Sequence, residues 1–335
     1  MSIHPWVAAS ATGPVRFGIQ AILGQDAGVY RRMLDTATLA DRLGFDAYYI
    51  FDHPLMQADP WTCLPAAAMV TERIRLGSAV NCAAYRHPAM LARLCADLDG
   101  ISEGRAILGL GSGWLEREFA ALGLPYPGTR DRQDLLDETL AIVLGTWEQP
   151  PFSYQGRLVT TAAMEVLPPP VQQPRPPVMI GGSGEQRTLR QVAQWGDACN
   201  VKEDDSTTDG TFAIEPRAAQ VARKLAALDR HCADLGRPRA EVLNTHFTLF
   251  LMLGESAAAA RRKYDAFDPG LSSSPGTRRA GKQGILCGSP DDLLAYYQAL
   301  VDVGIDYFVV QLDARDHETI TLLATDIMPR VTRRR

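Results

Sequence analysis

The feature that most constrains this chain is a repeated alternation of short apolar runs with longer amphipathic segments. The runs are rich in residues that favour strands, and the segments between them space their apolar residues as helices do. Eight runs are typical of strands: Arg16–Ala21, Ala47–Phe51, Ile74–Val80, Ala106–Leu110, Val178–Ile180, Asp197–Val201, Val242–Leu253 and Tyr307–Leu312. Strands that alternate with helices predict a parallel sheet with right-handed crossovers.

Eight strand–helix units favour closure into a barrel over an open doubly wound sheet. The helical segments carry start signals as well, because Ser289 and Asp292 are spaced as a capping box before one of them. We therefore expect an α/β protein of the (β/α)8 TIM-barrel type. No linker or repeat divides the chain, so residues 1–335 are treated as a single domain.

Two parts of the chain fall outside a minimal barrel. Residues 1–14 lack the basic start and apolar core of a secretory signal, and we expect a loose leader there. Residues 111–177 are expected to be an insertion after the fourth strand. This insertion is predicted to hold an extra helix and, around Tyr154–Arg157, a turn between two short strands.

Composition argues against several classes of protein. There are 34 Lys and Arg residues against 39 Asp and Glu, a net charge of −5, and no segment supplies the basic face that nucleic acid requires. No apolar run approaches the ~18 residues of a membrane helix. Six widely spaced cysteines predict reduced thiols in the cytoplasm, and the histidines lack ligand spacing, which predicts no metal.

In a parallel barrel, functional residues lie at the carboxyl ends of the strands. The second strand ends in Asp52 and His53, a carboxylate beside an imidazole that titrates near neutrality, which suits proton transfer. The same pair is equally compatible with a turn cap and an ordinary loop histidine. Lys202 follows the sixth strand, where it faces either an anionic substrate or, as is commoner for lysine, solvent.

Small residues follow the third and fourth strands, in Ser78–Asn81 and Gly109–Trp114. Such residues permit the close approach of a flat ligand, although tight packing in a narrow barrel explains them equally well. The glycines do not form a dinucleotide fingerprint, because the third glycine of that pattern falls on Trp114 and the segment is not the first strand.

The fifth strand leads into the glycine-rich turn Gly181–Arg187. Ser183 and Gln186 are spaced as a capping box, which predicts that the turn opens a helix. Backbone amides at a helix start form an anion site, so a phosphate is expected here. An ordinary capped turn is the alternative, and a Walker loop is excluded because no Gly-Lys-Ser/Thr follows.

Several of these blocks, in this order, resemble the bacterial luciferase-like family, and in particular its branch that depends on coenzyme F420. The resemblance covers nearly the whole chain, from about Arg16 to about Met328. The blocks that carry it are Asp41–Asp46, Asp52-His53, Tyr85–Pro88, Gly109–Trp114, Pro177–Gly184 and Gly288–Asp292.

The resemblance implies a cofactor ring at the carboxyl end of the barrel and a phosphate at the strand-five turn. It also implies a homodimer and a non-prolyl cis peptide, either Ala79–Val80 or Ser78–Ala79. His53 is expected to be catalytic, oriented by Asp52. The residues expected to bind the cofactor are Ser78, Ala79, Val80, Asn81, Ser112, Gly113, Gly181, Gly182, Ser183 and Gly184.

One position departs from the pattern. The sugar-phosphate dehydrogenases of this branch carry an acid/base glutamate where this chain has Trp114, so a less polar substrate is expected. Trp114 and Lys202 are the expected substrate contacts. The sequence thus predicts an oxidoreductase that transfers a hydride between coenzyme F420 and a small organic substrate. An FMN-dependent monooxygenase and a non-catalytic flavin-binding barrel are the alternatives.

Overall fold

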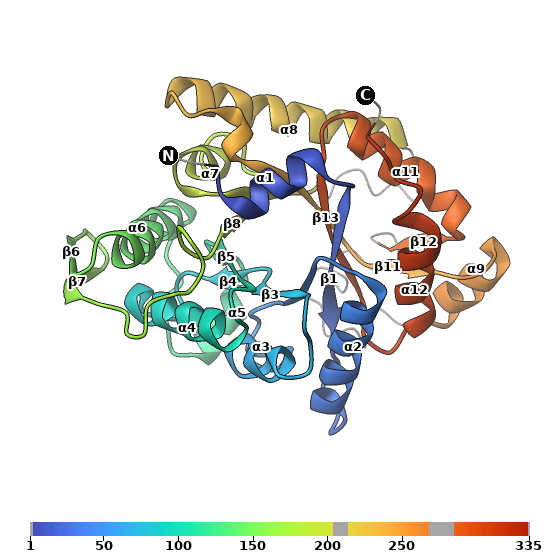
Figure 1. The fold of residues 1–335 in the computed structure, drawn as a ribbon, viewed down its shortest axis with the longest axis horizontal. Coiled ribbons are helices and arrows are strands. Elements are labelled where there is room, and N and C mark those ends of the chain that lie inside the picture. The colour runs from blue at the N-terminus through green and yellow to red at the C-terminus, as the bar shows by residue number, and fades with distance from the viewer. Residues whose placement is uncertain (1–2, 204–213, 268–284, 334–335) are drawn as a thin grey trace.

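The computed structural model describes residues 3–203, 214–267 and 285–333. Eight parallel strands form a barrel that closes between β3 and β5 (Figure 1). They are β1 Arg16–Ile22, β2 Ala47–Ile50, β3 Arg75–Ser78, β5 Ala106–Gly111, β8 Val178–Gly181, β9 Ala198–Val201, β10 Leu243–Thr248 and β13 Tyr307–Asp313. The predicted (β/α)8 TIM barrel is therefore confirmed.

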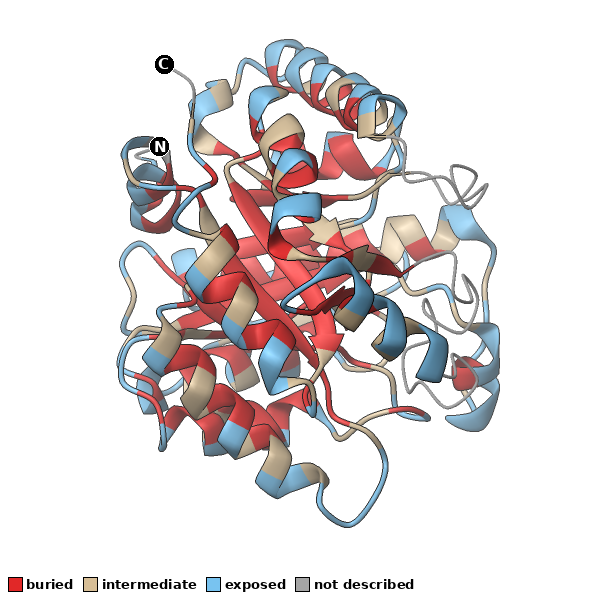
Figure 2. Cartoon of the chain, turned by 90° about the vertical axis from the view of Figure 1, so that its right-hand side faces the viewer, coloured by how far each residue is buried: buried red, intermediate tan, exposed pale blue. Residues whose placement is uncertain are grey.

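Helices surround the barrel, and their apolar faces turn toward the strands. They include α2 Val29–Leu43, α3 Pro60–Ala68, α4 Pro88–Ile101, α6 Thr129–Glu148, α7 Thr188–Trp195, α8 Ile214–Asp234, α11 Pro290–Asp302 and α12 His317–Leu322. Figure 2 shows buried residues on the strands and the inner helix faces, with exposed residues outside. The predicted capping box of Ser289 and Asp292 is present at the start of α11.

Two apolar layers lie on either side of the strands. The inner layer includes the rings of Tyr49 and Tyr307, and Gly18 leaves room for them, since a Cβ atom there would lie 2.7 Å from atoms of both side chains. The outer layer packs side chains such as Ile19 and Val310 against the helices. Burial on both faces explains why the strands read as continuous apolar runs.

The amino-terminal segment is not the loose leader that the sequence predicted. It forms α1 Pro5–Thr12, which covers the amino-terminal end of the barrel. Trp6 is fully buried, and its indole N–H donates to Asp46 Oδ2 at 3.1 Å. His4 caps the helix by accepting a hydrogen bond from the Trp6 amide. The prediction was wrong because the helix is held by contacts with residues distant in sequence, such as that of Trp6 with Asp46, which the local sequence does not reveal.

Only part of the segment 111–177 is additional to a barrel. The expected extra helix, α6, packs against α4 and α7 and serves as the crossover between the fourth and fifth barrel strands. The additions are the short helix α5 Glu116–Ala121 and an antiparallel hairpin of β6 Phe152–Gln155 and β7 Thr160–Met164. The turn of that hairpin spans residues 156–159, two residues further along the chain than the predicted Tyr154–Arg157.

The expected single strand Val242–Leu253 is two strands. β10 ends at Thr248, and Phe250 adopts a φ of 44°, which turns the chain away from the barrel. β11 Leu251–Leu253 then pairs with β12 Leu286–Gly288 in a separate small sheet, with α9 Ala257–Ala266 between them along the chain. The apolar run continues across the turn, so its composition did not reveal the break.

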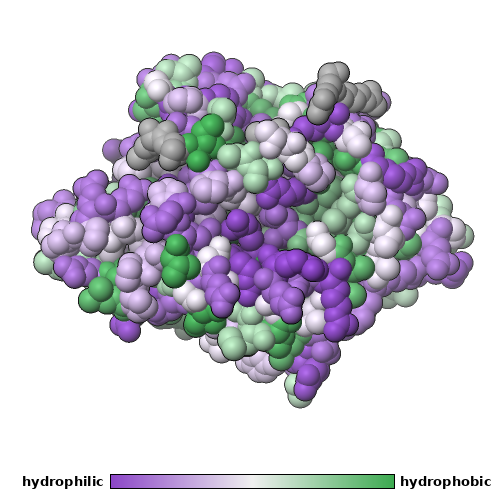
Figure 3. All heavy atoms as spheres, in the orientation of Figure 1, coloured by the Kyte–Doolittle hydropathy of each residue, from purple (hydrophilic) through white to green (hydrophobic). Residues whose placement is uncertain are grey.

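In the described part of the chain, no helix combines the length and apolar character that crossing a membrane requires. Figure 3 shows one face of the molecule, where hydrophilic residues cover much of the centre. Within the same described residues, no group of three or more His, Cys, Asp or Glu side chains could hold a metal ion. All six cysteines are unpaired.

Candidate active site

A bulge directly after β3 shapes the carboxyl end of the barrel. The peptide bond between Ala79 and Val80 is cis, which confirms the predicted non-prolyl cis peptide and fixes its position. The Ala79 carbonyl accepts a hydrogen bond from Gln20 Nε2, and Gln20 Oε1 accepts one from Gln311 Nε2. Side chains from β1 and β13 thus hold the bulge at the barrel mouth.

The glycines at the ends of β5 and β8 make room for this bulge. A Cβ atom on Gly111 or on Gly181 would lie 2.8 Å from a γ-carbon of Val80, and one on Gly109 would collide with the Ser78 carbonyl oxygen. The missing side chains of these glycines therefore accommodate the protein's own backbone and Val80. That the same glycines also admit a flat ligand stays a prediction.

Ser78 and Asn81 support the bulge from behind. Both side chains are fully buried. Asn81 Nδ2 donates to the Ser78 hydroxyl and, at 3.0 Å, to the Gly109 carbonyl, while Asn81 Oδ1 accepts from Trp61 Nε1 at 2.9 Å. These polar atoms are bonded within the protein, so the two residues position the bulge.

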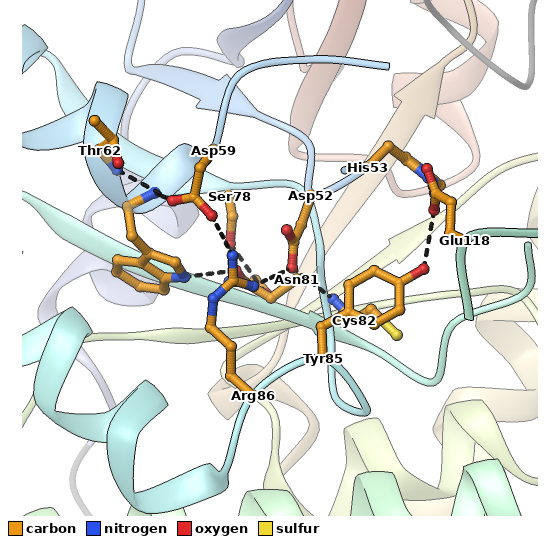
Figure 4. A network of polar contacts seen from close by, with 12 residues as sticks. Asp52, His53, Asp59, Thr62, Ser78, Asn81, Cys82, Tyr85, Arg86 and Glu118 are labelled. Carbon is orange, nitrogen blue, oxygen red and sulfur yellow. Dashed lines mark hydrogen bonds and ion pairs between the residues drawn. The ribbon is translucent and has the colours of Figure 1, made fainter. Parts of the chain in front are cut away.

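Asp52 belongs to an ion-pair network rather than to His53. Its carboxylate lies 2.6 Å from Arg86 Nη1, and Arg86 also pairs with Asp59, which caps α3 (Figure 4). Asp52 is 3% exposed, so burial raises the pKa of its carboxyl, while the Arg86 guanidinium opposes that rise. The expectation that Asp52 orients His53 is therefore wrong: the Asp52 carboxylate is held by Arg86.

The carboxylate that does contact His53 is Glu118, from α5. His53 Nδ1 lies 2.7 Å from Glu118 Oε2, and the Tyr85 hydroxyl donates to the same oxygen at 2.9 Å (Figure 4). Sequence analysis did not place Glu118. A weak signal existed, because Leu115 and Phe119 are four residues apart and mark the packed face of a short helix, which residue 118 adjoins.

Two aromatic rings flank His53. The ring centroids of Phe51 and Trp114 lie 5.5 Å and 5.9 Å from that of His53, both edge-on. Phe51 is buried in an apolar cluster, whereas Trp114 is 43% exposed. The structure thus brings Trp114 and His53 together, as the sequence predicted, and gives the imidazole apolar neighbours on two sides.

The turn after β8 is built differently from the predicted capping box. α7 begins only at Thr188, after an Arg187 N-cap without a side-chain hydrogen bond. The Ser183 hydroxyl instead accepts from the Lys202 amide at 3.1 Å, and the Gly182 amide donates to the Asn200 carbonyl at 3.3 Å. Both contacts cross to β9 or the residue after it, so the turn is fixed by its neighbouring strand.

The remaining predicted site residues lie around the same end of the barrel. Ser112 Oγ accepts from Gln133 Nε2 at 3.1 Å, and Gly113 has a φ of 76° that turns the chain toward α5. Gly184 lies in the turn before α7. Lys202 follows β9, and its carbonyl accepts from Lys224 Nζ at 2.6 Å.

A second histidine–glutamate–tyrosine group lies between the barrel and its helices. Glu203 Oε2 lies 3.2 Å from His246 Nε2, Glu203 Oε1 accepts from the Tyr296 hydroxyl at 2.7 Å, and Arg217 is 3.7 Å away. Burial alone would raise the pKa of Glu203, but His246 and the hydrogen bonds from His246 and Tyr296 lower it to about 2. His246 is fully buried.

These features define a parallel β/α barrel with a histidine, a buried carboxylate and a bulged strand at its mouth. The chain belongs to the luciferase-like monooxygenase family, whose pattern matches residues 15–307. It is 27% identical to the F420-dependent glucose-6-phosphate dehydrogenase of Microbacterium testaceum, over 96% of this chain and 99% of that protein.

Two solved structures share the fold. An F420-dependent secondary alcohol dehydrogenase superposes with a TM-score of 0.76 at 18% identity, covering 95% of this chain and 99% of that one. A monooxygenase from Streptomyces bottropensis also gives 0.76, at 23% identity, covering 94% and 99%. Proteins with different reactions thus share this barrel, and the fold alone does not select between them.

Proposed function

We propose that this protein is an oxidoreductase that uses coenzyme F420 to interconvert an alcohol and a carbonyl in a small organic substrate of low polarity. The observation that carries the proposal is the half-buried His53 at the barrel mouth, facing two aromatic rings. The full-length similarity to an F420-dependent dehydrogenase supports the choice of cofactor.

The residues at the mouth fit such a cofactor. The bulge at Ala79–Val80 offers a backbone platform held by Gln20, and the turn Gly182–Gly184 follows β8, which is separated from β3 by β5 alone. The Gly182 amide is already bonded to Asn200, so the backbone amides of the following residues in this turn are the ones that suit a phosphate. When bound, coenzyme F420 supplies a deazaflavin carbon that accepts or returns a hydride.

His53 would handle the proton of the same reaction. Its Nδ1 is bonded to Glu118, so Nε2 is the nitrogen directed elsewhere and suited to a substrate hydroxyl. In the oxidative direction, the substrate carbon loses its hydrogen with two electrons as a hydride, the hydroxyl proton passes to His53, and a C=O bond forms. Reduction is the reverse, with His53 returning the proton.

Trp114 supports a substrate of low polarity. Its exposed ring stands beside His53, where the related sugar-phosphate enzymes carry a glutamate, and the cluster containing Phe51 lies on the other side. We assign Trp114 to the substrate wall and Lys202 to the rim of the same site. We further expect a homodimer in a reducing cytoplasm.

The test is a titration with coenzyme F420 and, separately, with FMN. We expect F420 to bind. Gly182→Val should weaken binding at least about tenfold, because Gly182 has a φ of 134° and a Cβ there would lie 3.0 Å from Thr188 Cγ2. Gly100→Ala is the matched control, since no atom lies within 4 Å of a Cβ there. Preference for FMN would favour a monooxygenase instead, and F420 binding without turnover of any alcohol or ketone would favour a carrier.

A further inference from the structure

We infer that Glu118 is the positioning residue of this site: it holds His53 in one orientation and balances the charge that His53 acquires when it takes a proton. The inference rests on the proposed function, because it assigns His53 the proton. It places the carboxylate that contacts the histidine 65 residues from it in sequence, on the short helix α5.

The contact between Glu118 and His53 selects one tautomer of the imidazole. Glu118 is fully buried, and its Oε2 lies 2.7 Å from His53 Nδ1. An ionised carboxylate only accepts hydrogen bonds, so Nδ1 carries the proton and Nε2 of the neutral ring keeps its lone pair. The Glu118 contact therefore selects the tautomer that can accept a substrate proton.

The Glu118 carboxylate is itself held in place by Tyr85 and by helix α5. The Tyr85 hydroxyl donates to Oε2, and burial, with Cys82 and Glu118 nearby, raises the pKa of Tyr85, so this donor stays protonated. The neighbouring Phe119 ring packs on Tyr85, with centroids 5.3 Å apart. Helix α5 and Tyr85 thus fix the carboxylate independently of His53.

The two carboxylate oxygens of Glu118 differ in their polar contacts. Among the described residues, Glu118 Oε1 is a buried oxygen without a hydrogen-bond partner. A buried carboxylate with so few donors is costly unless a positive charge lies beside it. Protonation of His53 supplies that charge at 2.7 Å, so the buried carboxylate favours the protonated histidine that forms during oxidation.

The other titratable groups around His53 are already engaged. Asp52 precedes it in the chain but is paired with Arg86. Cys82 lies on β4 Asn81–Cys82, and burial raises the pKa of its thiol to about 12, so it remains neutral. Glu118 is therefore the carboxylate whose charge acts directly on the imidazole.

The test is a histidine titration by NMR in the ligand-free protein, with His53→Ala identifying the signal. Glu118→Gln should move the His53 titration to lower pH by about one unit or more, as expected when an opposite charge at this distance is removed. The matched control is Glu203→Gln, which should move the His246 signal instead. Asp52→Asn should affect His53 less than Glu118→Gln does.

An unchanged His53 titration in Glu118→Gln, or an equal shift in Asp52→Asn, would overturn the inference. Should Glu118→Gln fail to fold, Tyr85→Phe, which removes one donor from the carboxylate, should still alter the titration. In turnover, Glu118→Gln should shift the pH profile of kcat and leave cofactor affinity within about tenfold. Because the titration needs no cofactor, failure to bind coenzyme F420 would count against the proposed function and not against this pairing.

Discussion

The molecule contains two groups of the same three residue types, and they differ in where they lie. His53, Glu118 and Tyr85 meet at the barrel mouth, whereas Glu203 meets its own histidine and tyrosine between the barrel and the helices. The His53 side chain is 18% exposed and its counterpart is fully buried. The same three residue types therefore lie once beside solvent and once in the core.

Burial of the histidine, rather than the residue types, distinguishes the proposed site from the structural cluster. We call the group between the barrel and the helices, which is Glu203, His246 and Tyr296, the outer group. There Glu203 has a donor on each of its oxygens and Arg217 nearby, so its charge is balanced. In the group at the mouth, one oxygen of Glu118 has no partner among the described residues. The incompletely satisfied group is the one whose histidine is partly exposed, which agrees with the proposed function.

Replacing each histidine with alanine should give the largest difference between the two groups. His246→Ala should lower the free energy of unfolding by about 3 kcal/mol, because it leaves a buried carboxylate with fewer partners. His53→Ala should lower hydride transfer at least ~100-fold while coenzyme F420 binding stays within about tenfold. Denaturant unfolding and single-turnover absorbance measure the two effects, and a His53→Ala protein with full turnover would contradict the assignment.

The free energy of unfolding at acid pH should depend on the charge of Glu203 in the outer group. The pKa of Glu203 is lowered from 4.5 to about 2 in the folded state, so its stabilising contribution is present above pH 4.5 and is lost as the pH falls toward 2. The full contribution is on the order of 3 kcal/mol. Glu203→Gln should flatten the pH dependence of unfolding in that window, whereas Glu116→Gln, at an exposed position of α5, should not. If the unmodified protein and both variants showed the same pH dependence of unfolding, the conclusion that the charge of Glu203 is balanced in the outer group would be wrong.

Removing each tyrosine hydroxyl should give the smallest difference. Tyr296→Phe should cost about 2 kcal/mol of stability, because it deletes a buried hydrogen bond to a charged acceptor. Tyr85→Phe should cost about 1 kcal/mol or less, since Tyr85, unlike Tyr296, is only partly buried. Calorimetric melting of the two variants checks the order, and the reverse order would argue that the mouth group is the structural one.

Much of the fold could be predicted because it depends on local pattern. The eight apolar runs, the cap at Ser289 and the cis peptide near Ala79 all follow from adjacent residues or from the resemblance. The partner of His53 could not be predicted, since Asp52 is its neighbour in sequence while Glu118 becomes its neighbour only through packing of α5. Likewise, Ser183 matched a cap by spacing, but the hydroxyl bonds across to Lys202.

Helix α1 has a consequence for the order in which ligands bind. It covers the amino-terminal end of the barrel, and Trp6 is fully buried there. Under the proposed function, we therefore expect cofactor and substrate to enter at the opposite end. A molecule seated against the Ala79 bulge lies deeper than one beside Trp114 at the exposed rim. Steady-state kinetics should therefore be sequential and ordered, with the cofactor first to arrive and last to depart.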